Sequence, residues 1–291
     1  MIKVGASKSF AETERRAAFT ASATATAPAV TWLNLVCLDA PLVAIGWAWL
    51  FARSFGVPLA RGGSAALFLT AWLIYLADRL GDSFSLLPAA PASLRQRFCR
   101  RHRGVWLALI GLLAAADVFV IGTQLEAPSL RTGFAVGLAA LVYLLVNQLR
   151  PSLWRVLPLK ELSIGLLFAA GTIVALRPGL TNAMRPTWIL FAGVCACNCI
   201  GIAVWERALD LAQGRISVAT AFPRIEPWVA PLLLGLAATS VAWGLAIYGC
   251  LTASAVLLAL VHIFRSRLAP DVRTALADLV LLTPWLALAL P

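Results

Sequence analysis

Charged residues are scarce in this chain, and their scarcity sets the first limits on what it can be. They make up 13% of its 291 residues, against about a quarter in soluble globular domains. Only two residues are histidine and six are cysteine, so neither a zinc site nor a framework of disulfides is indicated. The period-2 alternation of an outer-membrane barrel is also absent from the sequence. These absences exclude an ordinary soluble domain and a membrane barrel.

Acidic residues are the scarcer of the two charged classes, with 13 Asp and Glu against 24 Lys and Arg, and the net charge is +11. Such a charge often indicates nucleic-acid binding. Here the basic residues are confined to loops between apolar runs, and no basic domain stands free of them. Orientation in a bilayer and contact with anionic lipid headgroups explain the charge better. We therefore exclude nucleic acid as a partner and expect a lipid bilayer instead.

Long apolar runs dominate what the sequence does contain. The chain is 61% hydrophobic, with a mean hydropathy of +0.86, and several runs reach the roughly 20 residues that a helix needs to cross a bilayer. The sequence predicts an all-α, polytopic integral membrane bundle (residues 28–291) behind a polar cytoplasmic tail (residues 1–27). The nine expected transmembrane helices lie at about 30–52, 62–81, 104–123, 132–149, 160–177, 186–208, 227–247, 249–264 and 273–290.

The positions of Lys and Arg predict the orientation of this bundle, because cytoplasmic loops carry an excess of basic residues. With the N-terminus in the cytoplasm, 19 of the 24 basic residues fall in cytoplasmic segments. We therefore expect an N-in, C-out protein, with a bacterial inner membrane as its location. The five basic residues left on the outer side are Arg53, Arg61, Arg131, Arg177 and Arg185.

Two short motifs repeat the same pattern about 130 residues apart. Residues 77–82 read Ala-Asp-Arg-Leu-Gly-Asp and residues 205–210 read Trp-Glu-Arg-Ala-Leu-Asp. In each motif two acids stand four positions apart, so they share one face of a helix. Each motif also ends an apolar segment that is predicted to run toward the cytoplasm. The four acids are Asp78, Asp82, Glu206 and Asp210.

Four carboxylates at a membrane edge are costly unless they bind a cation. Mg²⁺ prefers carboxylate and phosphate oxygens, so Mg²⁺ ions that hold a diphosphate fit this pattern. Arg79 and Arg207 could bind the phosphate oxygens by bidentate hydrogen bonds. In the plainer interpretation, these arginines pair with the motif acids at helix ends that face water.

At these residues the chain resembles the UbiA-type superfamily of intramembrane aromatic prenyltransferases, which have nine transmembrane helices and two Asp-rich motifs. The matching stretches are residues 74–82 and 199–210, with further likeness at 38–41 (Leu-Asp-Ala-Pro) and from Lys160 to Gly171. The resemblance implies Mg²⁺-dependent transfer of a prenyl group from a prenyl diphosphate to an aromatic or other lipophilic acceptor. It implies metal binding by the four acids, and substrate binding by Tyr75, Arg79, Lys160, Asn198 and Arg207.

The chain departs from the family pattern in both motifs, and Ile74 stands where the first motif has Asn. Tyr75 and Cys199 stand where the family has Asp, although Asn198 adjoins the second position. Two other interpretations therefore stay open. One is a prenyltransferase relative without catalytic activity. The other is a transporter that uses the acids to couple ions or protons.

Two further features have no assigned role at this point. Asp117 lies within an apolar run, where an ionisable group is a functional candidate. Residues 95–103 contain the densest group of arginines. They could contact lipid headgroups, or they could form a lid that collects an anionic substrate.

Overall fold

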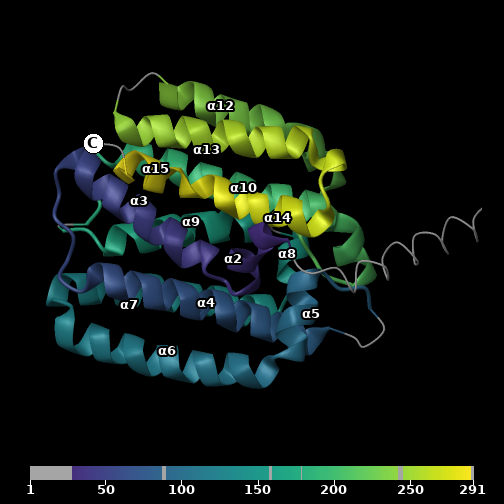
Figure 1. Ribbon diagram of the computed structural model, residues 1–291, viewed down its shortest axis with the longest axis horizontal. Coiled ribbons are helices and arrows are strands. Elements are labelled where there is room, and N and C mark those ends of the chain that lie inside the picture. Colours follow the sequence, from purple (N-terminus) through teal and green to yellow (C-terminus); the bar gives the residue numbers. More distant parts are fainter. Residues whose placement is uncertain (1–27, 87–89, 157–158, 178, 242–244, 290–291) are drawn as a thin grey trace, which may run out of the picture.

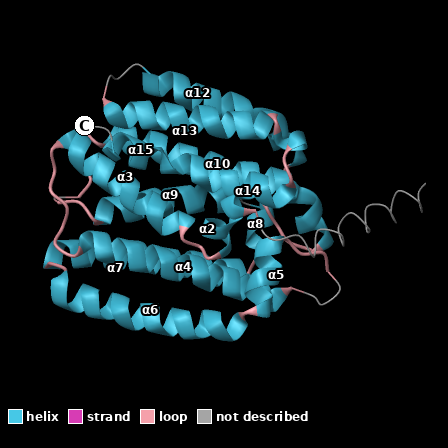
Figure 2. Ribbon diagram, in the orientation of Figure 1, coloured by secondary structure: helices cyan, strands magenta, loops and turns pink. Residues whose placement is uncertain are grey.

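The computed structural model describes residues 28–86, 90–156, 159–177, 179–241 and 245–289. Within these ranges every regular element is a helix, and one isolated bridge joins Leu59 to Leu176 (Figure 2). The all-α class expected from the sequence is therefore confirmed for the described residues. The expected tail, residues 1–27, lies outside them.

The longer helices lie side by side along one direction, and short elements gather at the ends (Figure 1). The elements in chain order are η1 (Ala29–Thr31), α2 (Trp32–Leu35), α3 (Asp39–Phe55), α4 (Gly63–Ser85), α5 (Leu94–Arg101), α6 (Arg103–Gln124), α7 (Ala127–Leu149), α8 (Leu153–Val156), α9 (Lys160–Val174), α10 (Arg185–Ala212), α11 (Val218–Ala221), η2 (Pro223–Trp228), α12 (Val229–Val241), α13 (Ala246–Ile263), η3 (Arg265–Arg267), α14 (Pro270–Leu279), η4 (Val280–Leu282) and α15 (Thr283–Ala289).

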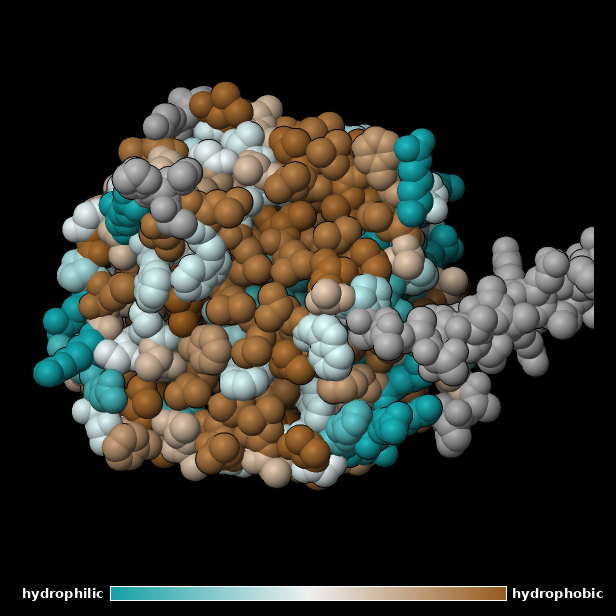
Figure 3. Space-filling model, viewed as in Figure 1, coloured by the Kyte–Doolittle hydropathy of each residue, from teal (hydrophilic) through white to brown (hydrophobic). Residues whose placement is uncertain are grey.

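Four of the described helices, α6, α7, α10 and α13, are long and apolar enough to cross a membrane. A fifth span results if residues 29–35 and α3, which are bent by 85° at a short break, count as one. The side shown in Figure 3 agrees with this reading, because a hydrophobic band lies between two ends that carry most of the hydrophilic residues. These apolar helices make the chain a plausible integral membrane protein.

The helices follow the nine expected segments with three differences. The first segment is broken before α3, and the last is divided into α14, η4 and α15. The break expected at Tyr248 and Gly249 is wrong, because both residues lie inside α13. The helices α9 and α12 have 15 and 13 residues, which is fewer than the roughly 20 that cross a bilayer without tilt or thinning.

The bend before α3 depends on one unusual backbone conformation. Cys37 adopts a φ of 58°, which is uncommon for a residue other than glycine. The turn places Asn34, at the end of α2, next to Asp39, at the start of α3, and the Asn34 amide donates to the Asp39 carboxylate at 2.8 Å. The bend thereby folds polar side chains of the N-terminal segment into the bundle.

The main packed core surrounds α10, with contributions from α3, α9, α12 and α13. The closest helix contact in it joins α9 to α10, where Gly165 removes the side chain between them. A Cβ at Gly165 would lie 2.6 Å from the backbone nitrogen of Ala196. Small residues that let backbones approach are the usual means of packing helices in a membrane. This contact fixes Lys160, at the start of α9, relative to the motif on α10.

Candidate functional site

The two acid motifs lie at the same end of the bundle, because α4 and α10 both finish there (right side of Figure 1). Asp78 and Asp82 are in the last turns of α4, and Glu206 and Asp210 are in the last turns of α10. The segment after α10 contacts the end of α4 directly. The Arg215 guanidinium pairs with the Asp82 carboxylate at 2.5 Å and donates to its backbone carbonyl at 3.1 Å.

Arginines from outside the motifs pair with two of the four acids. Arg215 pairs with Asp82, and Arg95 on α5 pairs with Glu206 at 2.6 Å. Thr274 on α14 adds a hydrogen bond to the second Glu206 oxygen at 3.3 Å. The plainer interpretation, in which the acids pair with the arginines of their own motifs, is therefore wrong for Asp82 and Glu206.

Asp78 and Asp210 have a different environment, because they share cations. Lys160 and Arg215 interact electrostatically with both carboxylates. Lys160 is the first residue of α9, so its ammonium group approaches from a third helix. Lys160 is thus linked electrostatically to one acid from each motif, although it forms no ion pair with either acid within the described residues.

The two motif arginines lie in unlike surroundings. Arg79 is close enough to Cys37, Tyr75 and Asp78 to interact electrostatically with each of them. The Nε of Arg207 is buried and has no hydrogen-bond partner within the described residues. An unpaired donor of this kind can bind an incoming anion.

The arginine-rich stretch forms a helix, α5, that closes over this end of the bundle. A capping box between Ser93 and Gln96 starts the helix, and α5 packs against α4 and α2. Arg103, which follows α5, donates to the Ser83 hydroxyl at 3.0 Å. Burial raises the pKa of the Cys99 thiol on the inner face of α5, so this thiol is a packing group and not a reactive one. The position of α5 is compatible with the lid interpretation and with contact to lipid headgroups.

A buried polar network beneath the motifs includes a residue that sequence reasoning missed, Asp278 on α14. The Asn34 amide nitrogen donates to the carboxylates of both Asp39 and Asp278 at 2.8 Å, and Asn198 donates to Asp278 at 2.9 Å. A small hollow of about 20 Å³ is lined by Asn198, Asp278 and Tyr75. An acid within the apolar segment 273–290 was the available signal for Asp278.

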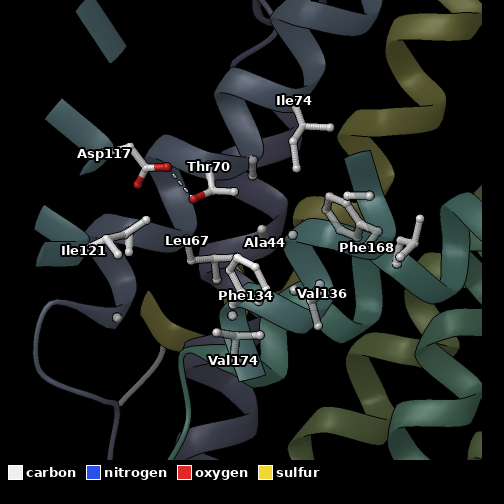
Figure 4. Close-up of a pocket in the computed structure, with 18 of the residues that line it drawn as sticks. Ala44, Leu67, Thr70, Ile74, Asp117, Ile121, Phe134, Val136, Phe168 and Val174 are labelled. Carbon is white, nitrogen blue, oxygen red and sulfur yellow. Dashed lines mark hydrogen bonds between the residues drawn. The ribbon is translucent and has the colours of Figure 1, made fainter. Parts of the chain in front are cut away.

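A large cavity adjoins this network. It has a volume of about 470 Å³ and lies among α4, α6, α7 and α9 (Figure 4). Its lining is almost wholly apolar, and Tyr75, Ile164 and Phe168 belong both to it and to the small hollow. Tyr75 stands three residues before Asp78 on α4, so the cavity ends about one helical turn from the acids. The cavity therefore approaches the charged end of the bundle, although none of the four motif acids lines it.

A fully protein-built metal site does not fit the described residues, because no group of three or more His, Cys, Asp or Glu side chains comes together there. Mg²⁺ that accompanies a diphosphate needs only one or two carboxylates, since phosphate oxygens and waters supply its other ligands. Within the described residues Asp78 and Asp210 form no ion pair, whereas Asp82 and Glu206 are held by guanidinium groups.

Comparisons with family models, with curated proteins and with solved structures gave no match to this chain.

Proposed function

We propose that this chain is a membrane prenyltransferase that moves a prenyl group from a prenyl diphosphate to a lipophilic acceptor. The observation that carries the proposal is the apolar cavity of about 470 Å³ that ends beside a cluster of acids and cations. Few other ligands combine a long apolar chain with a compact, highly charged head. The same combination supports the likeness to the UbiA-type superfamily.

The proposal includes nine membrane-crossing segments with the N-terminus in the cytoplasm. The four or five apolar spans are joined by α4, α9, α12 and the α14–α15 segment. In this orientation both motifs and α5 face the cytoplasm, where Mg²⁺ and soluble diphosphates are available. A bacterial inner membrane is the proposed location.

The charged end would hold the diphosphate through its cations. Lys160 and Arg207 would bind phosphate oxygens, and Arg79 would add positive charge from α4. Asp82 and Glu206 would position Arg215 and Arg95 as further donors. Asp78 and Asp210 would hold Mg²⁺, which when bound neutralises charge on the departing diphosphate. These groups stabilise the negative charge that develops as the allylic C–O bond breaks.

The cavity would hold the prenyl chain and keep water away from the reacting carbon. The C–O bond breaks with its electron pair on the diphosphate, and a bond from the acceptor to the allylic carbon replaces it. The acceptor then loses a proton. Asp278 lines the small hollow and shares the Asn34 amide with Asp39, so this carboxylate pair is proposed to take the proton. Asn198 and Tyr75, which also line the hollow, would position the prenyl acceptor.

The first test of the proposal measures ligand binding, and turnover is measured afterwards. We expect geranylgeranyl diphosphate to raise the melting temperature of the detergent-purified protein only when Mg²⁺ is present. At 100 times the dissociation constant the stabilisation is about 2.7 kcal/mol. Asp78→Asn and Asp210→Asn should each abolish it. Asp271→Asn is the matched control, because Asp271 accepts from the backbone of α5 and keeps an acceptor oxygen as Asn.

Release of diphosphate in the presence of candidate acceptors then separates the remaining interpretations. Binding that needs Mg²⁺ but gives no product with any acceptor would favour the non-catalytic relative, which the Tyr75 and Cys199 departures motivate. Absence of any shift with prenyl diphosphates would contradict the proposal and favour a transporter.

A further inference from the structure

The wall of the large cavity carries one isolated polar pair, formed by Asp117 on α6 and Thr70 on α4. The Thr70 hydroxyl donates to Asp117 Oδ2 at 2.7 Å, as the dashed line in Figure 4 shows. Asp117 is 5% exposed, and its other oxygen, Oδ1, is buried without a hydrogen-bond partner within the described residues. Both residues line the cavity. Asp117 therefore holds one unused carboxyl oxygen, buried at the edge of a cavity whose lining is mostly apolar.

An unpaired carboxyl oxygen in such a place is unfavourable. Burying a polar group without a hydrogen bond costs free energy, and at membrane depth no water from a bilayer core replaces the partner. If the cavity bound only a hydrocarbon chain, Leu or Val at position 117 would be more favourable than Asp. The neighbouring lining residues Leu67, Ile121 and Phe134 are of that kind. Asp117 differs from these residues, because its free oxygen can bind a polar atom of a ligand.

The rise of α4 indicates where the polar atom that Asp117 would bind lies along the ligand. Thr70 stands eight residues before Asp78 on α4, which corresponds to about 12 Å along the helix axis. The other polar lining residues, Tyr75 and Tyr143, belong to the charged end, since Asp78 acts electrostatically on Tyr143. The polar pair is thus separated from the diphosphate end by a stretch of apolar wall.

We propose that the cavity takes a lipid that carries a hydroxyl group partway along its apolar chain, and that Asp117 Oδ1 binds this hydroxyl. A hydroxyl group can donate to an ionised carboxylate and can accept from a neutral carboxylic acid, so it satisfies Oδ1 in either state. A plain polyprenyl chain leaves Oδ1 unpaired. The expected distance of about 12 Å from the head rests on the proposed function, whereas the preference for a hydroxylated lipid does not.

A purely structural role makes a different prediction. If the pair served only to clamp α4 to α6, removing either partner would have the same consequence, and neither change would alter the choice between lipids. If Asp117 binds the ligand, Asp117→Leu removes the ligand contact, while Thr70→Val keeps the carboxyl group and removes only its protein partner. Both variants remove the hydrogen bond between Thr70 and Asp117, and only Asp117→Leu also removes the free oxygen, so their contrast isolates that oxygen.

The experiment measures the affinity of the full chain for two lipids, geranylgeranyl diphosphate and the same compound hydroxylated mid-chain. We expect wild type to bind the hydroxylated compound about tenfold more tightly, as one hydrogen bond to a buried group supplies. Asp117→Leu should lose the preference for the hydroxylated compound, because the ligand hydroxyl would be buried without a partner, and Thr70→Val should keep the preference. Equal affinity in wild type, or loss of the preference in both variants alike, overturns the inference. The wild-type comparison decides the matter even if Asp117→Leu does not fold.

The corresponding alcohols, which lack the diphosphate, separate this inference from the proposed function. A preference for the hydroxylated alcohol without any Mg²⁺-dependent diphosphate binding supports Asp117 as a lipid contact and contradicts prenyl transfer. Mg²⁺-dependent binding with no preference between the two chains supports prenyl transfer and overturns the inference. Absence of binding by all four compounds overturns both.

Discussion

Two pairs of helices have similar hydropathy but differ in how much of their surface the protein buries. One pair is α10 and α13, and the other is α6 and α7. In their most apolar stretches, 56% of the α10 residues and 50% of the α13 residues are buried inside the protein, against 17% for α6 and 11% for α7. A transmembrane helix has no hydrophobic gain from packing on another helix, because lipid tails are equally apolar. The first pair is therefore held by close side-chain packing, and the second is left mostly to the lipid.

The cavity lies on the loosely covered side. The helices α6 and α7 form two of its walls, and neither is fixed by a large buried cluster: α6 contributes to the smaller of the two, around Leu76 and Trp106. Contacts that the protein does not make for itself can be made by a bound lipid. The packed half is therefore the scaffold, and the outer half is where we propose that a ligand binds.

The largest expected effect on stability comes from the closest contact of the packed half. Gly165→Ala places a Cβ 2.6 Å from the backbone nitrogen of Ala196, so α9 and α10 must move apart. We expect a loss of about 2 kcal/mol in the free energy of unfolding, as for other overpacked cores, measured by thermal or denaturant unfolding in detergent.

The matched control is Gly111→Ala on α6, where nothing lies within 4 Å of the added Cβ. It should cause no loss, because Ala is the better helix former. Equal destabilisation at Gly111 and Gly165 would mean that the two halves are packed alike and would remove the comparison.

An intermediate effect on stability is expected where the packed half and the outer half are joined. The ion pair between Asp82 and Arg215 links α4 to the segment after α10, and its side chains are 21% and 24% exposed. A double-mutant cycle with Asp82→Asn and Arg215→Gln should give a coupling of about 1 kcal/mol, the upper end for pairs of this kind.

The comparison pair is Glu126 with Arg177, at the opposite end of the bundle, whose side chains are 43% and 45% exposed. Its coupling should be below about 0.5 kcal/mol, because water screens an exposed pair more strongly. A stronger coupling at Glu126 would show that the charged end does not hold the halves together.

The sequence predicted the helices and the meeting of the motifs better than it predicted the partners within the site. Hydropathy located the long apolar helices, four of which are long enough to cross a membrane, and the alternating direction of the expected helices put the ends of α4 and α10 together. It could not show that Arg95 reaches Glu206 across 111 residues, or that Asn34 reaches Asp278 across 244. Such contacts depend on tertiary packing and leave no local periodic pattern.

The bend before α3 was also beyond sequence reasoning. A left-handed residue in a turn is usually Gly or Asn, whereas here it is Cys37, in the middle of an apolar run that predicted a continuous helix. The bend brings Asn34 and Asp39 together, so the missed turn and the missed buried network have one cause. The cavity was missed for a related reason, because Leu, Phe and Gly lining residues have the same pattern as residues that face lipid.

The smallest expected effect on stability is at the cavity wall, and it is the most informative about function. Gly137 lines the cavity on α7 and has nothing within 4 Å of an added Cβ. Gly137→Leu should change the free energy of unfolding by less than about 1 kcal/mol, because its side chain enters empty space. It should nevertheless abolish stabilisation by geranylgeranyl diphosphate, since it occupies part of the volume that the chain needs. Ala139→Leu, exposed on the same helix, should leave that stabilisation intact. If Gly137→Leu kept the full ligand response, the lipid would have to bind outside this cavity, and the outer half would be only a lipid-facing surface.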